Sequence, residues 1–223
     1  MNNGQGDILI AVAHPSEEEA VRRAVHAAGC RCEVIVTGVG GAAMSWALQK
    51  RFASGSIPSV VIGAGIAGSY VKSMPPGTVV TIVSDCFADM GVDDNGRFIP
   101  LFVAGLADAD TPPFTGGRIP CTGRFFEIAS GLMPVARGAT VNMASGSQAV
   151  IDRIRKAWDP EIETMEGAWL AYTCAMSGIP WISVRAVSNM VEPRNLKNWN
   201  ITLALRNLEE KMIQLPGLLA APA

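Results

Sequence analysis

The chain has 223 residues, of which 49% are hydrophobic and 17% are charged, and its formal net charge is −2. This length and apolar content suit one well-buried α/β domain, so we expect residues 1–223 to form a single domain with loose tails at 1–6 and 216–223. The charge leaves no basic stripe to displace counterions, which argues against a nucleic-acid partner.

The compartment and the absence of a metal follow from a few residue types. Residues 1–7 are polar and lack the basic region of a signal peptide, and no run approaches the ~20 apolar residues of a membrane span. Five cysteines occur without a Cys-x-x-Cys pair, and the only histidines are His14 and His26. We therefore expect a cytoplasmic protein with reduced thiols, with no metal and no cofactor.

The first predicted unit is a strand over residues 7–13 followed by a helix over 16–28. Ser16 and Glu19 fit a capping box, in which Glu19 would only satisfy its own helix end. The alternative is that a carboxylate at the carboxyl edge of the first strand holds and deprotonates a water molecule.

Two glycine-rich segments follow the next two strands. A strand at 33–37 turns through Gly38–Gly41 into a helix over 42–53, and a strand at 59–62 enters Gly63–Gly68. Gly63–Gly68 has the G-x-G-x-x-G spacing of a dinucleotide site, with Asp85 near the distance of a ribose-binding acid. However, Pro75–Gly77 interrupts any helix after about a turn, so the context counts against that site.

The middle of the chain alternates loops with short elements. We predict a strand over 78–83, long loops over 86–118 that form a lid or a subunit contact, and short strands near 98–103. A helix at 125–133, a strand at 139–143, a helix at 148–158 and a short strand at 161–164 follow.

The segment 163–194 carries the clearest chemistry. A helical apolar stripe begins at Met165, and residues 181–187 form a mostly apolar strand that ends at Ser188 and Asn189. Glu166 at the helix start would stay ionised and accept hydrogen bonds from a diol, while the Asn189 amide could bind a planar heterocycle edge-on. The plainer alternatives are a dipole-compensating glutamate and a turn-forming asparagine. An amphipathic helix over 196–215 closes the chain.

These features together resemble the nucleoside phosphorylase and nucleosidase superfamily, over essentially the whole chain. Within it, Glu163–Ala168 and Val184–Asn195, with Trp199–Ile201 beyond, are most similar to the futalosine hydrolase family. The resemblance implies a three-layer α/β/α fold with a central mixed, largely parallel twisted sheet. It also implies hydrolysis of futalosine to hypoxanthine and dehypoxanthinyl futalosine in menaquinone biosynthesis, by a homodimer or higher homo-oligomer.

The resemblance also implies roles for individual residues. Glu19 would activate water, Glu166 would bind the ribose hydroxyls, and Asn189 would stabilise the leaving hypoxanthine. Asn189 stands where adenine-specific nucleosidases have an aspartate, which suits a 6-oxopurine because an amide N–H can donate to N7 or O6. The other expected substrate-binding residues are Met165, Ala67, Gly68, Gly40, Ser188 and Arg194.

Two departures from the nucleosidase pattern bear on the geometry of the site. Ile66 replaces a serine in the third-strand loop, and Ala149 stands where relatives have a base-stacking phenylalanine. Either another aromatic residue, for example from the loop around Phe87, covers the purine, or the stacking is absent. The glycine loops carry no arginine for phosphate, since Arg22, Arg23 and Arg51 lie farther along their helices, which favours water as the nucleophile.

The 5′ carboxylated aromatic group of futalosine needs an apolar slot and a cation, for which the candidates are Arg194, Lys197, Lys72 and Arg118. The alternatives to futalosine hydrolysis are a purine nucleoside phosphorylase, a methylthioadenosine/S-adenosylhomocysteine-type nucleosidase, a nicotinamide-dependent oxidoreductase and a catalytically silent purine-binding module.

Overall fold

The computed structural model describes residues 7–220, so the predicted tail at 1–6 and the last three residues of the predicted tail at 216–223 lie outside this range. Its main sheet has eight strands in the order β10-β4-β8-β9-β3-β1-β2, with β7 paired to β4. A further pairing joins β10 to β3, so part of the sheet closes on itself. The strands of this sheet are β1 (Ile8–Val12), β2 (Cys32–Val36), β3 (Val60–Ser69), β4 (Val79–Asp85), β7 (Ile119–Pro120), β8 (Val135–Thr140), β9 (Ile162–Thr164) and β10 (Trp181–Met190).

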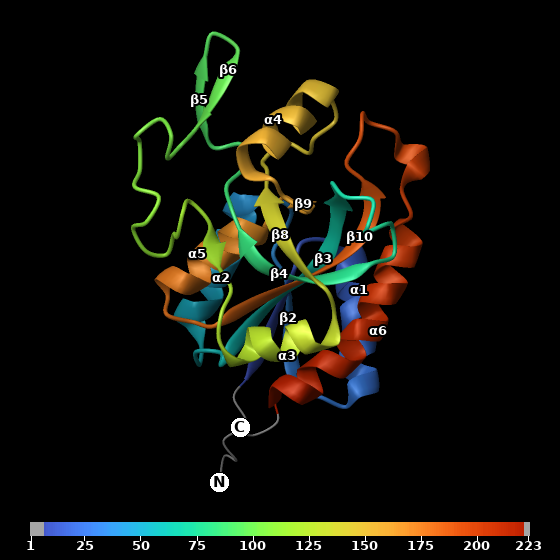
Figure 1. Cartoon of the computed structure of the whole chain (residues 1–223). Coiled ribbons are helices and arrows are strands. Elements are labelled where there is room, and N and C mark those ends of the chain that lie inside the picture. The colour runs from blue at the N-terminus through green and yellow to red at the C-terminus, as the bar shows by residue number, and fades with distance from the viewer. Residues whose placement is uncertain (1–6, 221–223) are drawn as a thin grey trace.

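Helices cover both faces of this sheet, as Figure 1 shows. One layer pairs the first and last helices, α1 and α6, and the opposite layer pairs α2 with α5. A separate hairpin of β5 and β6 projects away from the body (Figure 1). The helices are α1 (Pro15–Ala28), α2 (Gly41–Ser54), α3 (Arg124–Leu132), α4 (Gln148–Trp158), α5 (Gly167–Met176), the 3-10 turn η1 (Leu196–Asn198) and α6 (Ile201–Ala220), and the hairpin strands are β5 (Gly91–Asp94) and β6 (Arg97–Pro100).

The pairing directions make the sheet mixed and largely parallel. β1 pairs in parallel with β2 and β3, β3 with β10, and β8 with β4 and β9, while β10–β4, β3–β9 and β4–β7 are antiparallel. The three central strands β1, β3 and β10 are almost fully buried because helices lie on both sides. The predicted three-layer α/β/α fold is therefore confirmed.

Strand β3 extends further than predicted. The residues Gly63–Gly68 continue the strand rather than form a loop. Gly63, Gly65 and Gly68 each leave space that a side chain from another part of the fold approaches. A Cβ on Gly63 would lie 2.7 Å from Leu170, and one on Gly65 would lie 2.6 Å from the Glu17 carboxylate. The glycines are needed for close side-chain approach, not for a phosphate turn.

This arrangement does not fit a dinucleotide site. After β3 the chain makes a short turn and enters β4, so the helix that a G-x-G-x-x-G motif requires is missing from this part of the described chain. Asp85 is fully buried and accepts from the Cys86 N–H and the Thr140 hydroxyl, and burial raises its pKa to about 6. It cannot reach a ribose.

The C-terminal helix is also longer than expected. α6 continues through Pro216 to Ala220, where a loose tail from residue 216 was predicted. Leu215, Pro216 and Leu219 are buried, so this end of the helix is held by packing against the body. Among residues 7–220, no helix combines the length and the apolar character needed to cross a bilayer.

Candidate functional site

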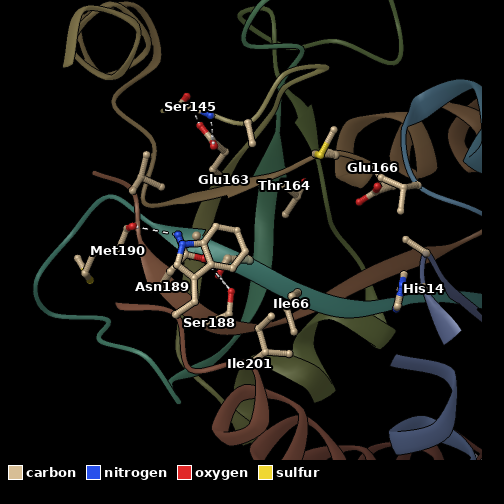
Figure 2. A pocket seen from close by; sticks show the side chains of 18 of the residues that line it. His14, Ile66, Ser145, Glu163, Thr164, Glu166, Ser188, Asn189, Met190 and Ile201 are labelled. Carbon is tan, nitrogen blue, oxygen red and sulfur yellow. Dashed lines mark hydrogen bonds between the residues drawn. The ribbon is translucent and has the colours of Figure 1, made fainter. Parts of the chain in front are cut away.

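A cavity of about 340 Å³ opens at the carboxyl ends of β1, β3 and β10. This is the edge at which open α/β sheets bind ligands, and the volume is within the usual range for small-molecule pockets. Figure 2 shows Glu166 and His14 at one end of it and Glu163, Ser145 and Asn189 at the other. Of the nine predicted site residues, the lining includes Met165, Glu166, Ala67, Gly68, Ser188, Asn189 and Arg194.

Glu17 lies shortly after β1 in the chain, and it lines the cavity. It is only 5% exposed, and its Oε2 accepts from the main-chain N–H groups of Ala13 at 2.9 Å and His14 at 3.0 Å. Its Oε1 accepts from the N–H of Ile66 on β3 at 2.9 Å. Three main-chain donors fix this carboxylate between β1 and β3.

Glu19, the residue predicted to activate water, lies elsewhere. Its side chain is 78% exposed and pairs with Arg23 at 2.9 Å on the outer face of α1. The helix begins at Pro15 with His14 as its N-cap, so Glu17 and not Glu19 occupies the third helical position and completes the capping box. Two residues along a helix turn a side chain by about 200°, which carries Glu19 away from the sheet.

Glu166 lines the same end of the cavity as Glu17. It is the N-cap residue of α5, is 6% exposed, and its Oε1 accepts from the Gly40 N–H at 2.8 Å. Burial raises the pKa of Glu166, and the positive charge of Arg185 and the Gly40 N–H partly oppose that rise. Gly40 itself is not part of the lining and acts on the cavity through Glu166.

Arg185 is a buried cation close to these two carboxylates, and no role was predicted for it from the sequence. Its side chain is 2% exposed, its Nε donates to the Ser183 hydroxyl at 3.0 Å, and one terminal nitrogen has no hydrogen-bond partner. A Cβ on Gly65 would meet both the Glu17 Oε1 and an Arg185 nitrogen, which places these groups on one face of β3. The sequence feature that indicates a role for Arg185 is its position as a single charged residue within a mostly apolar strand.

Asn189 lies within β10, whereas it was predicted to follow the end of that strand. Its Oδ1 lies 2.8 Å from the Ser188 hydroxyl, and its Nδ2 donates to the Met190 carbonyl at 2.9 Å. Because a carbonyl can only accept, this contact fixes which end of the amide carries hydrogens. One amide N–H is left over, and the side chain lines the cavity (Figure 2).

Ala67 and Gly68 belong to the floor of the cavity rather than to a free loop. Both lie in β3, and Gly68 pairs with Asn189 on one side and with Glu163 on the other. Within this strand, the main-chain N–H of Ile66 donates to the Glu17 carboxylate.

The aromatic cover predicted near Phe87 comes from another segment. Phe87 is buried and stacks edge-on against Trp169 at 4.8 Å and Tyr172 at 6.1 Å, away from the cavity. Trp199, between η1 and α6, is half-buried and is the one Phe, Tyr or Trp side chain of residues 7–220 that lines the cavity.

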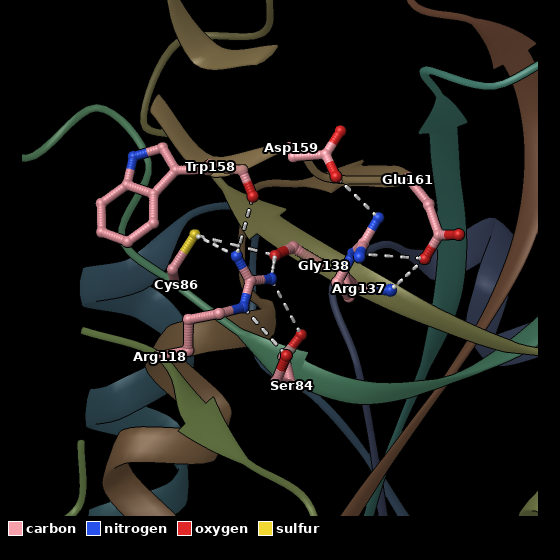
Figure 3. A network of polar contacts seen from close by, with 8 residues as sticks. All are labelled: Ser84, Cys86, Arg118, Arg137, Gly138, Trp158, Asp159 and Glu161. Carbon is pink, nitrogen blue, oxygen red and sulfur yellow. Dashed lines mark hydrogen bonds and ion pairs between the residues drawn. The ribbon is translucent and has the colours of Figure 1, made fainter. Parts of the chain in front are cut away.

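The structure also distinguishes the predicted cations. Arg194 lines the cavity, whereas Lys72 and Lys197 do not. Figure 3 shows Arg118 inside a separate network, where it donates to the Gly138 carbonyl at 2.6 Å and to the Ser84 hydroxyl at 2.9 Å. Arg118 therefore links the segment before β7 to strands β4 and β8.

The arginines weighed as phosphate ligands also have partners outside the cavity. Arg22 pairs with Glu18, Arg23 with Glu19 and Glu209, and Arg51 with Glu33.

Both the sequence and the fold of this chain resemble those of known proteins. Residues 11–221 match the family model described as the phosphorylase superfamily. A futalosine hydrolase of Acidothermus cellulolyticus is 33% identical over 92% of this chain and 81% of its own length, and one of Streptomyces coelicolor is 29% identical over 95% and 96%. The solved futalosine hydrolase of Helicobacter pylori has a similar fold, with a TM-score of 0.76 at 14% identity over 94% of this chain and 97% of its own.

Proposed function

The chain belongs to the phosphorylase superfamily and, within it, to the futalosine hydrolase family, and we propose that it hydrolyses the N-glycosidic bond of futalosine to release hypoxanthine. The observation that carries this proposal is the pair of buried carboxylates, Glu17 and Glu166, at one end of a cavity whose other end presents the Asn189 amide. Glu17 suits water, Glu166 suits the hydroxyls of a sugar, and the Asn189 amide suits an oxopurine.

At the sugar end, Glu17 orients and deprotonates the attacking water. Its two oxygens are already held by three main-chain N–H groups, which leaves a rigid acceptor aimed at the cavity. Glu166 binds the ribose hydroxyls, and its negative charge stabilises the oxocarbenium-like transition state. Arg185 lies beneath and helps to keep Glu166 ionised, because its charge lowers the pKa that burial raises.

At the base end, Asn189 stabilises the purine as it leaves. Its unused N–H donates to N7 or O6 of hypoxanthine, where electron density builds up as the bond at N9 breaks. Trp199 covers the base and supplies the stacking surface that Ala149 does not.

Water is favoured over phosphate as the nucleophile by the charges around the sugar end. Phosphate needs cations that contact its oxygens, but Arg185 is buried under the carboxylates and already bonds to Ser183. Two nearby carboxylates would also repel a phosphate anion.

The 5′ carboxylate of futalosine is assigned to Arg194. Of the four cations weighed from the sequence, it is the one that lines the cavity, and it is exposed to solvent. A guanidinium forms paired hydrogen bonds with a carboxylate, which suits this role.

The protein is also proposed to work in the cytoplasm as a homo-oligomer. Val39, which lines the cavity, is 56% exposed, and Trp46 on α2 is 71% exposed, so apolar side chains lie at the cavity mouth and on a neighbouring helix. Light scattering on the purified chain tests this, and a monomer at all concentrations would contradict it.

Hypoxanthine release tests the main proposal. Futalosine is incubated with the protein with and without phosphate, and the products are separated by chromatography. Equal release in both, with a free sugar product, is expected. Release that depends on phosphate and yields a sugar 1-phosphate would indicate a phosphorylase, and turnover of methylthioadenosine but not futalosine would indicate the adenine-specific relatives.

A further inference from the structure

The cavity contains a third buried carboxylate, Glu163, which the mechanism above does not use. It is 7% exposed and lines the end of the cavity opposite Glu17 and Glu166. Figure 2 shows it beside Ser145, on the side where Asn189 lies. A buried carboxylate is costly unless it is bound to donors, so its presence at the base end needs an explanation.

Sheet pairing places Glu163 and Asn189 on either side of one glycine. Gly68 of β3 is opposite Glu163 of β9 and opposite Asn189 of β10. With strands about 4.8 Å apart, the two Cα atoms are separated by roughly 10 Å. Gly68 has no side chain, and a Cβ there would already meet Val191 at 2.8 Å and Asn189 at 3.3 Å. Gly68, Glu163 and Asn189 all line the cavity, so a planar base at this edge of it would have one polar group at each side.

The hydrogen bonds of Glu163 leave one acceptor position unused. Its Oε2 accepts from the hydroxyls of Tyr70 and Ser145, and its Oε1 accepts from the Ser145 N–H at 2.9 Å. Burial and the Glu163 charge raise the pKa of Tyr70, so this hydroxyl stays protonated and donates. A carboxylate has about four acceptor positions, so Oε1 can take one more donor.

We propose that Glu163 is a specificity residue that accepts the N1–H of a 6-oxopurine, while Asn189 donates to the neighbouring O6 or N7. This rests on the proposed purine nucleoside function and adds the residue that selects the base. Hypoxanthine has a donor at N1, whereas adenine has a lone pair there, which a carboxylate repels. The two side chains together thus match the polar edge of an oxopurine and mismatch that of adenine.

The test compares binding of free bases to the whole protein by calorimetry. The wild-type chain is expected to bind hypoxanthine at least tenfold more tightly than adenine, because a charge-assisted hydrogen bond is gained in one case and a repulsion in the other. In the Glu163→Gln variant, whose amide can either donate or accept, the hypoxanthine-to-adenine ratio is expected to fall about tenfold.

Glu161→Gln is the matched control. Glu161 lies two residues away, outside the cavity, and its carboxylate accepts from the Arg137 N–H at 2.8 Å. The base ratio of this variant should equal that of the wild-type chain. If Glu163→Gln weakens both bases equally or changes neither, Glu163 only anchors the Ser145 loop and the proposal is wrong.

A second measurement needs no variant. The base 1-methylhypoxanthine keeps O6 and N7 but lacks the N1–H, so the wild-type chain should bind it at least tenfold more weakly than hypoxanthine. Equal binding would overturn the role of Glu163. Because both tests use free bases, they are independent of whether futalosine is hydrolysed, so failure of the proposed reaction and failure of this inference give different results.

Discussion

The two ends of the cavity are built from different kinds of hydrogen-bond donor. At the sugar end, main-chain N–H groups of Ala13, His14, Ile66 and Gly40 hold the carboxylates of Glu17 and Glu166. At the base end, the donors to Glu163 and Asn189 include side-chain hydroxyls of Tyr70, Ser145 and Ser188.

Because of this difference, substitutions can alter the hydrogen bonds of the base end more easily than those of the sugar end. Main-chain donors are set by the path of β1, β3 and α2, so no single substitution removes them without disturbing the fold. Side-chain donors can be exchanged one at a time. The sugar end is therefore expected to determine whether the reaction occurs, and the base end to determine which purine is accepted.

The largest expected effect is at the sugar end. Glu17→Gln should lower kcat for futalosine by about 10²–10⁴, because the amide cannot take a proton from water, while hypoxanthine binding stays nearly unchanged. Glu19→Gln is the matched control, since Glu19 is exposed on the same helix, and its kcat should stay within about twofold. A larger loss in Glu19→Gln than in Glu17→Gln would restore the assignment made from sequence.

At the base end, Asn189→Asp should change the preference between hypoxanthine and adenine nucleosides more than it changes kcat. An ionised aspartate accepts from the amino group of adenine and faces O6 of hypoxanthine with repulsion, so the ratio of kcat/KM for the adenine analogue over futalosine should rise at least tenfold. Steady-state kinetics on both nucleosides measure this ratio. An unchanged ratio would show that Asn189 does not contact the base.

A smaller effect is expected from the aromatic cover. Trp199→Ala should weaken hypoxanthine binding by about tenfold, since stacking of a base on an aromatic ring contributes about 1–3 kcal/mol. Trp199→Phe keeps a ring and should recover most of the loss. If Phe and Ala behave alike in calorimetry, Trp199 contributes something other than stacking.

The mildest test is the pH dependence of kcat/KM. Burial raises the pKa of Glu166, so this carboxylate becomes protonated at a higher pH than an ordinary glutamate as the pH falls. Activity should therefore decline on the acid side with a midpoint above 4.5, the ordinary value for Glu. In Glu166→Gln the remaining activity should lose this dependence, and an identical acid limb in that variant would assign the titration to another group.

The sequence predicted the fold well because periodicity and turn residues determine most elements locally. Helix α4 and the buried strand β10 follow directly from apolar spacing, and Glu166 and Asn189 were found because each directly precedes or ends such an element. The length of β3 was missed, because its glycines suggested a loop while their actual cause is the approach of Leu170 and Glu17 from other elements.

The site was harder to predict where it depends on helix phase. The choice between Glu17 and Glu19 turns on whether the helix begins at Pro15 or Ser16, and the capping pattern of Ser16 with Glu19 favoured the wrong start. Proline at the first helical position was the available signal. Trp199 and Glu163 could not be assigned from sequence because their relation to the cavity depends on distant strands and on the end of η1.

The most direct test of the account is a crystal structure of the Glu17→Gln variant with futalosine, in which slow turnover preserves the substrate. We expect that the ribose hydroxyls bond to Glu166 and that the hypoxanthine lies between Glu163 and Asn189, with its O6 or N7 edge on Asn189. A base bound away from Asn189, or ribose hydroxyls bound away from Glu166, would contradict this arrangement.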